Sequence, residues 1–390
     1  MIRILTFGLF ITIAITIIIL MVKYFLFRLR EAFPSLKKYR KHLRVMYLPL
    51  FGAFFIFSKR ELQGTFTDTV AAYFLYSYFT VIFIFALYGI FVELIISIRC
   101  LFPGLYRKKL PQTKRTLLFM VLFLVAFHSV VSGLFMAENI VIERVEIKSP
   151  KVIERTRIVQ ISDVHFSQVT GVDFAEKISK AINHLKPDIL ICTGDYLDHG
   201  IVDPQAVTSA MKNIKAPFGK YAVSGNHEFI NGIDQSIEFV KRNGFKFIDN
   251  KVEDVGRNIM LLGIADKTAL RFGKIKPDDL EILKKGSEEK FRIFLKHQPE
   301  IKKEDTEYFD LMLSGHTHAG QIFPFGIFVR MAFKYCSGNY YFDSGSLLHV
   351  NRGTGTWGPP VRFAATSEIT VIDLISEKES LEDPAKLVVE

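Results

Sequence analysis

The sequence predicts an α/β domain at residues 157–375, preceded by an all-α transmembrane anchor of about four helices at residues 1–137. Two observations predict this architecture. Four long uncharged stretches lie before residue 138, and from residue 157 onward short apolar runs alternate with amphipathic ones. The 390-residue chain is 49% hydrophobic with a mean hydropathy of +0.23, which excludes a disordered chain and indicates that part of it lies in lipid.

The charge of the chain divides at the same place. Residues 1–150 hold 19 Lys and Arg against 7 Asp and Glu, a net charge of +12, whereas the remainder has a net charge of −2. Basic residues between apolar runs are typical of cytoplasmic membrane loops, whereas a nucleic-acid binder is expected to carry them on a folded domain. We therefore expect a lipid bilayer as partner and no nucleic acid, and no protein partner is evident.

The membrane anchor is predicted from the uncharged stretches, which are residues 4–22, 45–58, 69–92 and 116–137. A spanning helix needs about 20 apolar residues, which the first, third and fourth stretches provide. The second is short enough to be a re-entrant or interfacial segment instead. If all four span, the basic segments 23–44 and 99–115 lie on one side, which the positive-inside rule makes cytoplasmic.

Four spans place the C-terminal domain on the extracytoplasmic side of a plasma or inner membrane, although five basic residues between 144 and 157 weaken this interpretation. The first stretch exceeds a signal-peptide core and no small-x-small site follows it, so we expect an uncleaved helix. Among Asp, Glu, Lys, Arg and His, the four stretches contain only His128, which disfavours a transporter or channel. Three cysteines are too few for a disulfide framework and leave the compartment open.

The elements of the C-terminal domain follow from their patterns. Apolar runs predict strands at 158–161, 189–193, 221–224, 260–264, 292–296, 311–314 and 369–374. Apolar residues at helical spacing predict helices at 174–185, 204–214 and 233–241. We expect a linker and first strand at 138–156, a charged surface helix with loops at 274–305, and a frayed tail at 376–390.

Polar residues that can bind metals follow five of these strands. They are Asp163, His165, Asp195, Asn226, His227, His297, His316 and His318. Ligands of an open α/β sheet bind beyond the carboxyl ends of its strands, so these residues should meet at one edge. Mixed oxygen and nitrogen ligands suit divalent Mn, Fe, Zn or similar ions. The set is too large for one ion and predicts two ions, which can clamp the attacking and leaving oxygens of a phosphoryl group.

The order of these motifs resembles that of the calcineurin-like metallophosphoesterases over residues 155–375. The motifs are Asp-x-His, Gly-Asp-x-x-Asp, Gly-Asn-His-Glu, His and Gly-His-x-His. Residues 315–322 (GHTHAGQI) and 353–362 (GTGTWGPPVR) resemble the YkuE/YaeI-type branch more closely, whose members often carry N-terminal membrane helices. The resemblance implies a four-layer αββα sandwich and a metal-dependent phosphoesterase.

The resemblance also implies roles for single residues. Asp163, His165 and His318 would bind one ion, Asn226, His297 and His316 would bind the other, and Asp195 would bridge them. His227 would assist the leaving oxygen, with Asp198 orienting its ring, and a metal-bridging hydroxide would attack the phosphorus.

Three further residues are candidate substrate contacts, namely His199, Arg352 and Arg362. His199 stands where phosphoprotein phosphatases of this superfamily have arginine, which argues against a Ser/Thr protein phosphatase. Glu228, where some members have aspartate, is a departure without expected consequence.

The very apolar segment 322–333 bears on the substrate. It is expected to be a core strand or packed loop, with a lip at the membrane interface as the alternative, since aromatic residues are favoured there. Membrane attachment suggests a phosphoester or pyrophosphate substrate at the membrane, such as a phospholipid, a lipid-linked sugar phosphate or an envelope glycan phosphate. Two alternatives remain: a cytoplasm-facing pyrophosphatase acting on a nucleotide-activated lipid precursor, and a metal-binding regulatory scaffold.

Overall fold

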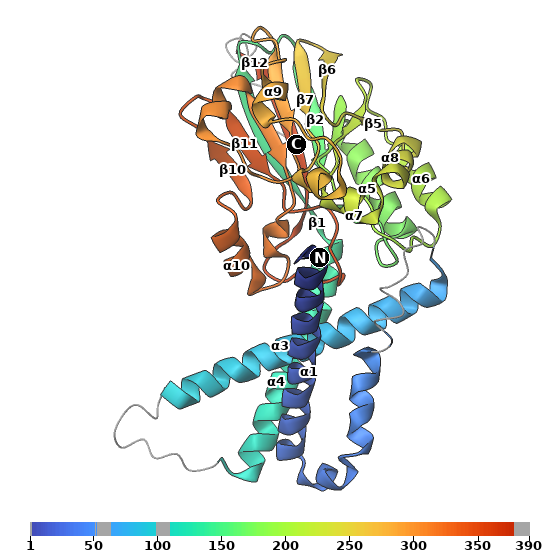
Figure 1. Cartoon of the computed structure of the whole chain (residues 1–390), viewed down its shortest axis with the longest axis vertical. Coiled ribbons are helices and arrows are strands. Elements are labelled where there is room, and N and C mark those ends of the chain that lie inside the picture. The colour runs from blue at the N-terminus through green and yellow to red at the C-terminus, as the bar shows by residue number, and fades with distance from the viewer. Residues whose placement is uncertain (1, 51, 53–63, 99–109, 378–390) are drawn as a thin grey trace. The chain divides into compact units, whose positions relative to one another are not determined.

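A computed structural model of the chain describes residues 2–50, 52, 64–98 and 110–377 (Figure 1). The chain divides into two compact units, one of residues 1–59 and 70–134 and the other of residues 60–69 and 135–390. We call them the helical unit and the α/β unit. The domain limits expected at residues 137 and 157 stay predictions.

Long apolar helices dominate the helical unit. Among the described residues, three helices are long and apolar enough to cross a membrane: α1 (Ile2–Ala32), α3 (Phe66–Ile98) and α4 (Gln112–Glu138). Short 3-10 helices η1 (Pro34–Tyr39) and η2 (His42–Tyr47) follow α1. Half of the predicted second stretch, 45–58, lies outside the described residues, so whether it spans stays a prediction.

Polar side chains join the three long helices at one end of the helical unit. Arg28 of α1 forms an ion pair with Glu93 of α3, and the Tyr24 hydroxyl donates to the Glu93 carboxylate at 2.8 Å. Glu31 of α1 pairs with Arg115 of α4 at 3.0 Å. The end of α1, the end of α3 and the start of α4 therefore lie together.

The strands of the α/β unit form two six-stranded sheets within its described residues. The first sheet has the order β1 (Ile140–Ser149), β12 (Ser367–Ser376), β2 (Thr156–Ile161), β3 (Ile189–Cys192), β4 (Lys220–Ala222), β5 (Lys246–Phe247). The second has the order β10 (Gly338–Tyr341), β11 (Leu347–Val350), β9 (Leu311–Ser314), β8 (Phe291–Leu295), β7 (Ile259–Gly263), β6 (Lys251–Gly256). Strands β2 to β5 are parallel to one another, as are β7 to β9.

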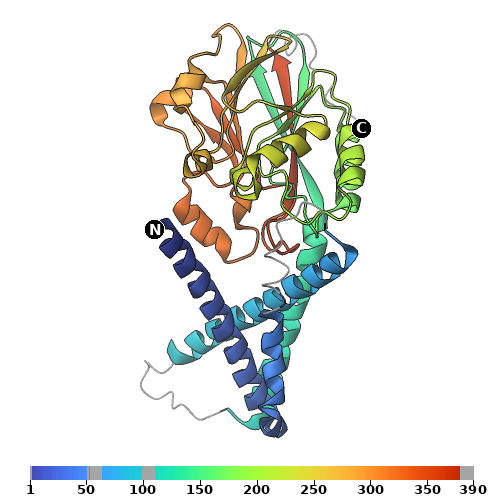
Figure 2. The ribbon, with the colours of Figure 1, turned by 45° about the vertical axis from the view of Figure 1, so that its right-hand side comes forward.

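The sheets pack face to face because successive strand residues alternate between two apolar environments. Ile158 and Leu261 belong to the core between the sheets. Their neighbours Val159 and Leu262 face outward, toward helices on opposite sides of the sandwich. These helices are α5 (Val172–Leu185), α6 (Pro204–Lys212) and α8 (Ile233–Arg242) on the first sheet, and α9 (Asp279–Leu283) with η5 (Lys303–Tyr308) on the second (Figure 2). The four-layer αββα sandwich is thus confirmed.

One sequence expectation about the fold is wrong. Residues 322–333 were expected in a core strand or packed loop, but Phe325–Ala332 form the helix α10, in which no residue is buried. A short apolar run can form its backbone hydrogen bonds in a helix as readily as in a strand. Composition alone therefore did not decide between helix and strand. The short helices α7 (Asn226–Asn231), η4 (Lys267–Phe272) and η6 (His318–Gly320) also follow strands.

Candidate metal centre

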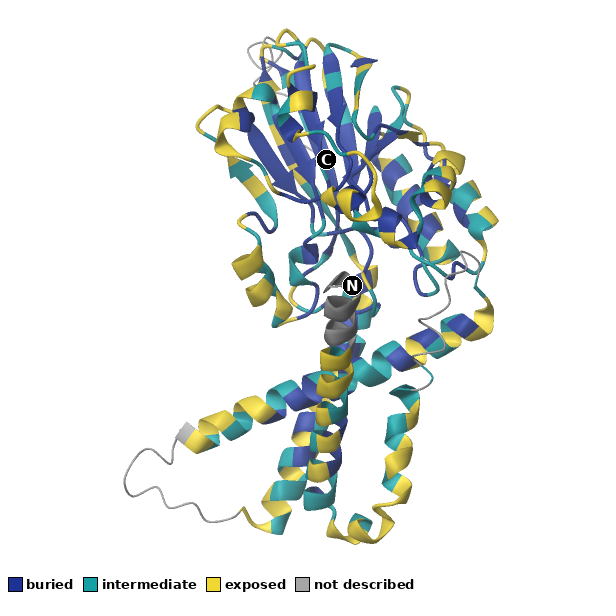
Figure 3. Ribbon diagram, viewed as in Figure 1, coloured by how far each residue is buried: buried dark blue, intermediate teal, exposed yellow. Residues whose placement is uncertain are grey.

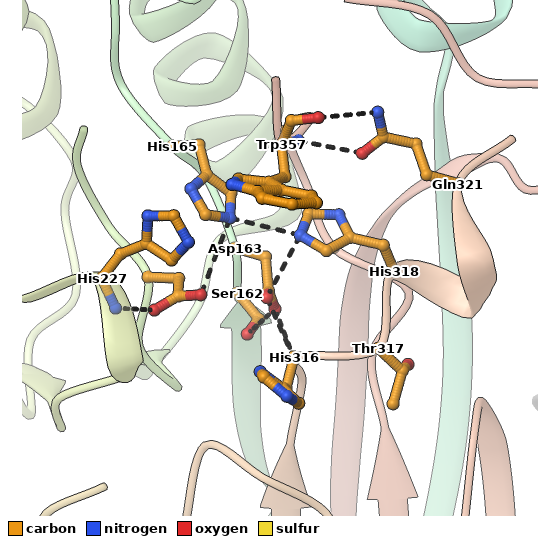
Figure 4. Close-up of polar contacts among 12 residues, drawn as sticks. Ser162, Asp163, His165, His227, His316, Thr317, His318, Gln321 and Trp357 are labelled. Atoms are coloured by element: carbon orange, nitrogen blue, oxygen red, sulfur yellow. Dashed lines mark hydrogen bonds and ion pairs between the residues drawn. The ribbon is translucent and has the colours of Figure 1, made fainter. Parts of the chain in front are cut away.

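The metal-competent residues come together where the carboxyl ends of the two sheets meet. Residues after β2, β3 and β4 contribute from the first sheet, and residues after β8 and β9 from the second. The side chains form three overlapping groups, which are Asp163/His165/His318, His165/Asp195/His227 and Asp195/His297/His316. The predicted meeting of the strand ends is therefore found (Figure 4).

The first group is compact and buried. His165 Nε2 and His318 Nε2 lie 3.2 Å apart, and His318 Nε2 lies 3.4 Å from Asp163 Oδ1. Two ligand atoms that are each about 2.1 Å from one ion lie about 3.0–3.4 Å from each other. The spacing of this group thus fits one divalent ion.

The second group centres on His297, which is fully buried. Its Nε2 lies 3.1 Å from His316 Nδ1, 3.2 Å from Asn226 Oδ1 and 3.2 Å from Asp195 Oδ2. Its Nδ1 lies 2.8 Å from the carbonyl oxygen of Thr193 and donates to it, which leaves Nε2 as the ligand atom. These four donors fit a second ion by the same spacing argument.

Asp195 lies between the two groups. Its Oδ2 is 3.2 Å from His297 Nε2 and 3.7 Å from His165 Nε2. Its Oδ1 accepts the backbone N–H of His227 at 2.8 Å, which fixes the carboxylate plane.

The backbone at this centre adopts an unusual conformation. Five of the grouped residues have positive φ angles between 48° and 72°, namely Asp163, His165, Asp195, His316 and His318. Non-glycine residues rarely adopt this left-handed region, and such strain persists only where the surroundings enforce it. The strand-end loops therefore aim these side chains inward at a cost in local stability, a feature that residue spacing alone did not reveal.

Two glycines allow the loops to approach one another. A Cβ atom on Gly225 would overlap the Asp195 carboxylate, and one on Gly315 would overlap Ser162 Oγ and the Asp163 carboxylate. These close approaches bring the loops after β2, β3, β4 and β9 around one centre, and no other residue type fits at either position without displacing a metal-competent side chain.

Glu228 matters more than the sequence suggested. It is buried, and its carboxylate accepts three backbone N–H groups, from Asp195 at 2.9 Å, Tyr196 at 2.7 Å and Gly225 at 2.6 Å. One side chain thus ties the loop after β3 to the loop after β4. It positions Asp195 without belonging to the metal-competent groups.

Asp198 contacts two histidines. Its carboxylate lies 2.6 Å from His227 Nδ1 and 3.1 Å from His165 Nδ1, and it also accepts from Asn231 Nδ2 at 3.2 Å. Burial alone would lower the pKa of His227, but the Asp198 and Asp195 carboxylates outweigh it and raise that pKa to about 10. The His227 ring is therefore a proton donor near neutral pH.

The two histidines of the loop after β9 behave in the opposite way. Burial and the neighbouring His297 lower the pKa of His316 to about 3. Burial and the neighbouring His165 lower the pKa of His318 well below its ordinary value. Both rings are neutral near pH 7, which is the form that binds metal ions.

The predicted substrate contacts lie in different surroundings. His199 is partly exposed beside Asp198. Arg352 pairs with Glu368 and, at 3.2 Å, with Glu143. Arg362 is fully buried and donates to the carbonyls of residues 352, 353 and 355, so it could reach a substrate only by giving up these bonds. Contact with substrate stays a prediction for all three.

Trp357 was not predicted as part of the site. It is 58% exposed, and its ring centroid lies 6.1 Å from that of His227. The Gln321 side chain holds the backbone of Trp357 in both directions, donating to its carbonyl at 3.0 Å and accepting its N–H at 2.9 Å (Figure 4). A large aromatic surface is thereby fixed beside the metal-competent groups.

The chain matches known proteins in this region. The family described as calcineurin-like phosphoesterase matches residues 156–320. An uncharacterized metallophosphoesterase of Aquifex aeolicus is 32% identical over 237 residues, which make up 60% of this chain and 91% of that protein. The chain belongs to the calcineurin-like metallophosphoesterases. The expected resemblance is confirmed, and the protein is a metal-dependent phosphoesterase whose family uses a two-metal centre.

Two more relatives extend this assignment. The metallophosphoesterase YkuE of Bacillus subtilis is 32% identical over 238 residues, 56% of this chain and 79% of that protein. A transmembrane protein with metallophosphoesterase domain from Danio rerio is 30% identical over 239 residues, 58% of this chain and 55% of that protein. The first bears out the expected branch. The second is named as a transmembrane protein, and within its described residues this chain has three helices long and apolar enough to cross a membrane.

Proposed function

We propose that the protein hydrolyses a phosphoester or pyrophosphate bond of a membrane-associated or cell-envelope substrate. The observation that carries this proposal is that two ligand groups, Asp163/His165/His318 and Asp195/His297/His316, lie next to each other where the carboxyl ends of the two sheets meet. Such a pair suits two ions that act together on one phosphoryl group.

The ligand groups support an assignment of roles. Asp163, His165 and His318 would hold one ion, and Asn226, His297 and His316 would hold the other. Asp195 would serve both ions, since its Oδ2 lies within 3.7 Å of a histidine from each group. When bound, the two ions make a water molecule acidic enough to supply the attacking hydroxide near neutral pH and neutralise charge on the phosphoryl oxygens.

His227 donates a proton to the leaving oxygen in this proposal. Its Nδ1 is engaged by Asp198, which leaves Nε2 for the substrate, and its raised pKa keeps the ring protonated near pH 7. Asp198 orients the ring and, through His165 Nδ1, also orients a ligand of the first ion.

Hydrolysis of aryl phosphate mono- and diesters by the detergent-purified chain tests this function. We expect Mn²⁺-dependent release of the phenol, its loss on chelation and its return when Mn²⁺ is added back. A preference for one ester class would narrow the substrate. Rates equal to those of the Asp195→Asn variant, with two ions shown to be bound, would favour the regulatory scaffold instead.

We further propose that the α/β unit lies on the extracytoplasmic side of the membrane. In the sequence, one basic segment follows α1 and another precedes α4. The end of α1 and the start of α4 lie together in the helical unit, and the chain runs from there along α4 into the α/β unit. The positive-inside rule makes the basic end cytoplasmic, so the far end of α4 faces outward.

Accessibility of introduced cysteines tests this sidedness. In a chain with Cys100, Cys192 and Cys336 replaced by serine, we expect Glu288→Cys to react with an impermeant thiol reagent in intact cells, and Lys37→Cys to react only after permeabilisation. The reverse pattern would favour the cytoplasm-facing pyrophosphatase.

A further inference from the structure

We propose that the edge of the α/β unit that carries the metal centre docks on the lipid bilayer. Helix α10 and Trp357 enter the lipid interface, and the centre acts on the phosphate of a lipid headgroup in that bilayer. This inference rests on the proposed function for the hydrolysis itself, and it adds that the substrate is a lipid of the bilayer on which the unit docks.

Helix α10 is the first observation. It has no buried residue, and its ribbon carries only the exposed and intermediate colours in Figure 3. Phe325, Ile327, Phe328 and Met331 are 46%, 52%, 60% and 79% exposed. Soluble proteins rarely expose so much apolar surface on one short helix. Such an exposed apolar patch marks an interaction site.

This helix is joined to the metal centre. Phe333, at the end of α10, packs against His316 with ring centroids 5.2 Å apart. At its start, Gly320 approaches Gly326 so closely that a Cβ atom would overlap the Gly326 backbone. Gln321, between His318 and α10, holds Trp357. A surface that covers α10 would therefore lie beside the ligand groups.

The path of the chain identifies what covers this surface. In the α/β unit, the Ser367 hydroxyl donates to the carbonyl of Ala137 at 2.8 Å, and Ala137 lies just before β1 in the chain. Thr354 connects this point to the centre: its hydroxyl donates to the Glu368 carbonyl at 2.7 Å, and its N–H donates to the Ser162 carbonyl at 2.7 Å. The end of α4 thus enters the unit at the edge that carries Asp163.

The other connection to the helical unit enters at the same edge. Thr69 Oγ1 donates to the carbonyl of Gln168 at 2.9 Å, and the N–H of Gly64 donates to the carbonyl of Ile201 at 2.8 Å. These partners lie three residues after His165 and two after His199. Both links to the long apolar helices therefore leave the α/β unit at the edge that carries the metal centre, which is the edge to which α10 is joined.

The side chains around α10 suit a lipid interface. Arg330 and Lys334 are exposed at its end, where long cationic side chains can reach anionic headgroups while aromatic rings enter the interface. At the opposite end of the unit, the exposed apolar residues are Ile153, in the loop between β1 and β2, and Tyr341, the last residue of β10. They provide a matched control.

Trp357 is the only tryptophan of the chain and reports directly on docking. We would place the full chain in nanodiscs of phosphatidylcholine, with and without bromine on the upper acyl chain, and record tryptophan emission at equal metal loading. We expect brominated lipid to remove most of the emission. The double variant Phe325→Asp/Phe328→Asp should keep its emission, and Ile153→Asp/Tyr341→Asp should behave as the wild type.

Turnover in the same discs separates this inference from the proposed function. With phosphatidic acid and phosphatidylglycerol as monoester and diester, the α10 variant should lose about tenfold in turnover of the preferred lipid, because two buried phenyl rings are lost from the interface. Its turnover of a soluble aryl phosphate should not change. Equal emission in both lipids, or unchanged lipid turnover in the α10 variant, would overturn the docking, whereas inactivity of the wild type on every ester would overturn the function itself.

Discussion

The Asp195→Asn variant should lose turnover on the order of 10³-fold and bind fewer than two metal ions per chain. Asp195 Oδ2 lies 3.2 Å from His297 and 3.7 Å from His165, so this oxygen is placed to serve both ligand groups. An amide oxygen carries no full charge, and the amide nitrogen cannot bind a cation. Metal content by mass spectrometry and turnover of an aryl phosphate measure the two effects.

A matched substitution controls for general damage. Asp343→Asn removes an exposed carboxylate that pairs with Lys303, and it should leave both metal content and turnover at wild-type values. If Asp195→Asn kept two ions and full activity, Asp195 would not bridge them. If it kept its metals but lost activity, the carboxylate would act on the reaction and not on binding.

The position of the site could be predicted because it depends on local rules. Strands end two to four positions before Asp163, Asp195, Asn226, His297 and His316. The carboxyl ends of parallel strands share an edge, so the order of motifs was enough to bring these residues together. The apolar helices were equally predictable, since length and the absence of charge define a membrane span.

The means by which the loops hold these side chains could not be predicted. The left-handed conformations at Asp163, His165 and His318 are imposed by tertiary contacts, and no local pattern marks them. Glu228 appeared to be a minor departure, yet it accepts three backbone N–H groups from two loops. Two of these contacts join residues 32 and 33 positions apart in the sequence, which motif spacing does not record.

Helix α10 shows a different limit of sequence reasoning. An apolar run is expected in a core because water is assumed to surround the domain. The same run is stable on a surface when lipid provides the apolar environment, and composition does not distinguish the two cases. The exposed fractions of Phe328 and Met331 supplied the missing information.

The His227→Ala variant should lose about 10²–10⁴-fold in turnover of an alkyl phosphoester while keeping two metal ions. His227 Nδ1 lies 2.6 Å from Asp198, and the raised pKa of the ring keeps a proton on it for the proposed donation to the leaving oxygen. A nitrophenolate leaves without a proton, so the loss should be much smaller for a nitrophenyl ester. The dependence of rate on leaving-group pKa, compared between variant and wild type, measures this role.

The alternative role for His227 is also visible in the structure. His227 forms a metal-competent group with His165 and Asp195, so it could be a ligand. In that case His227→Ala would lose metal and would slow both esters equally, and added Mn²⁺ would restore part of the rate. His184→Ala, at an exposed position on α5, should change neither quantity. Retained metal together with a steeper dependence on the leaving group would assign His227 to proton transfer, because a ligand cannot be removed without cost to the ion it holds.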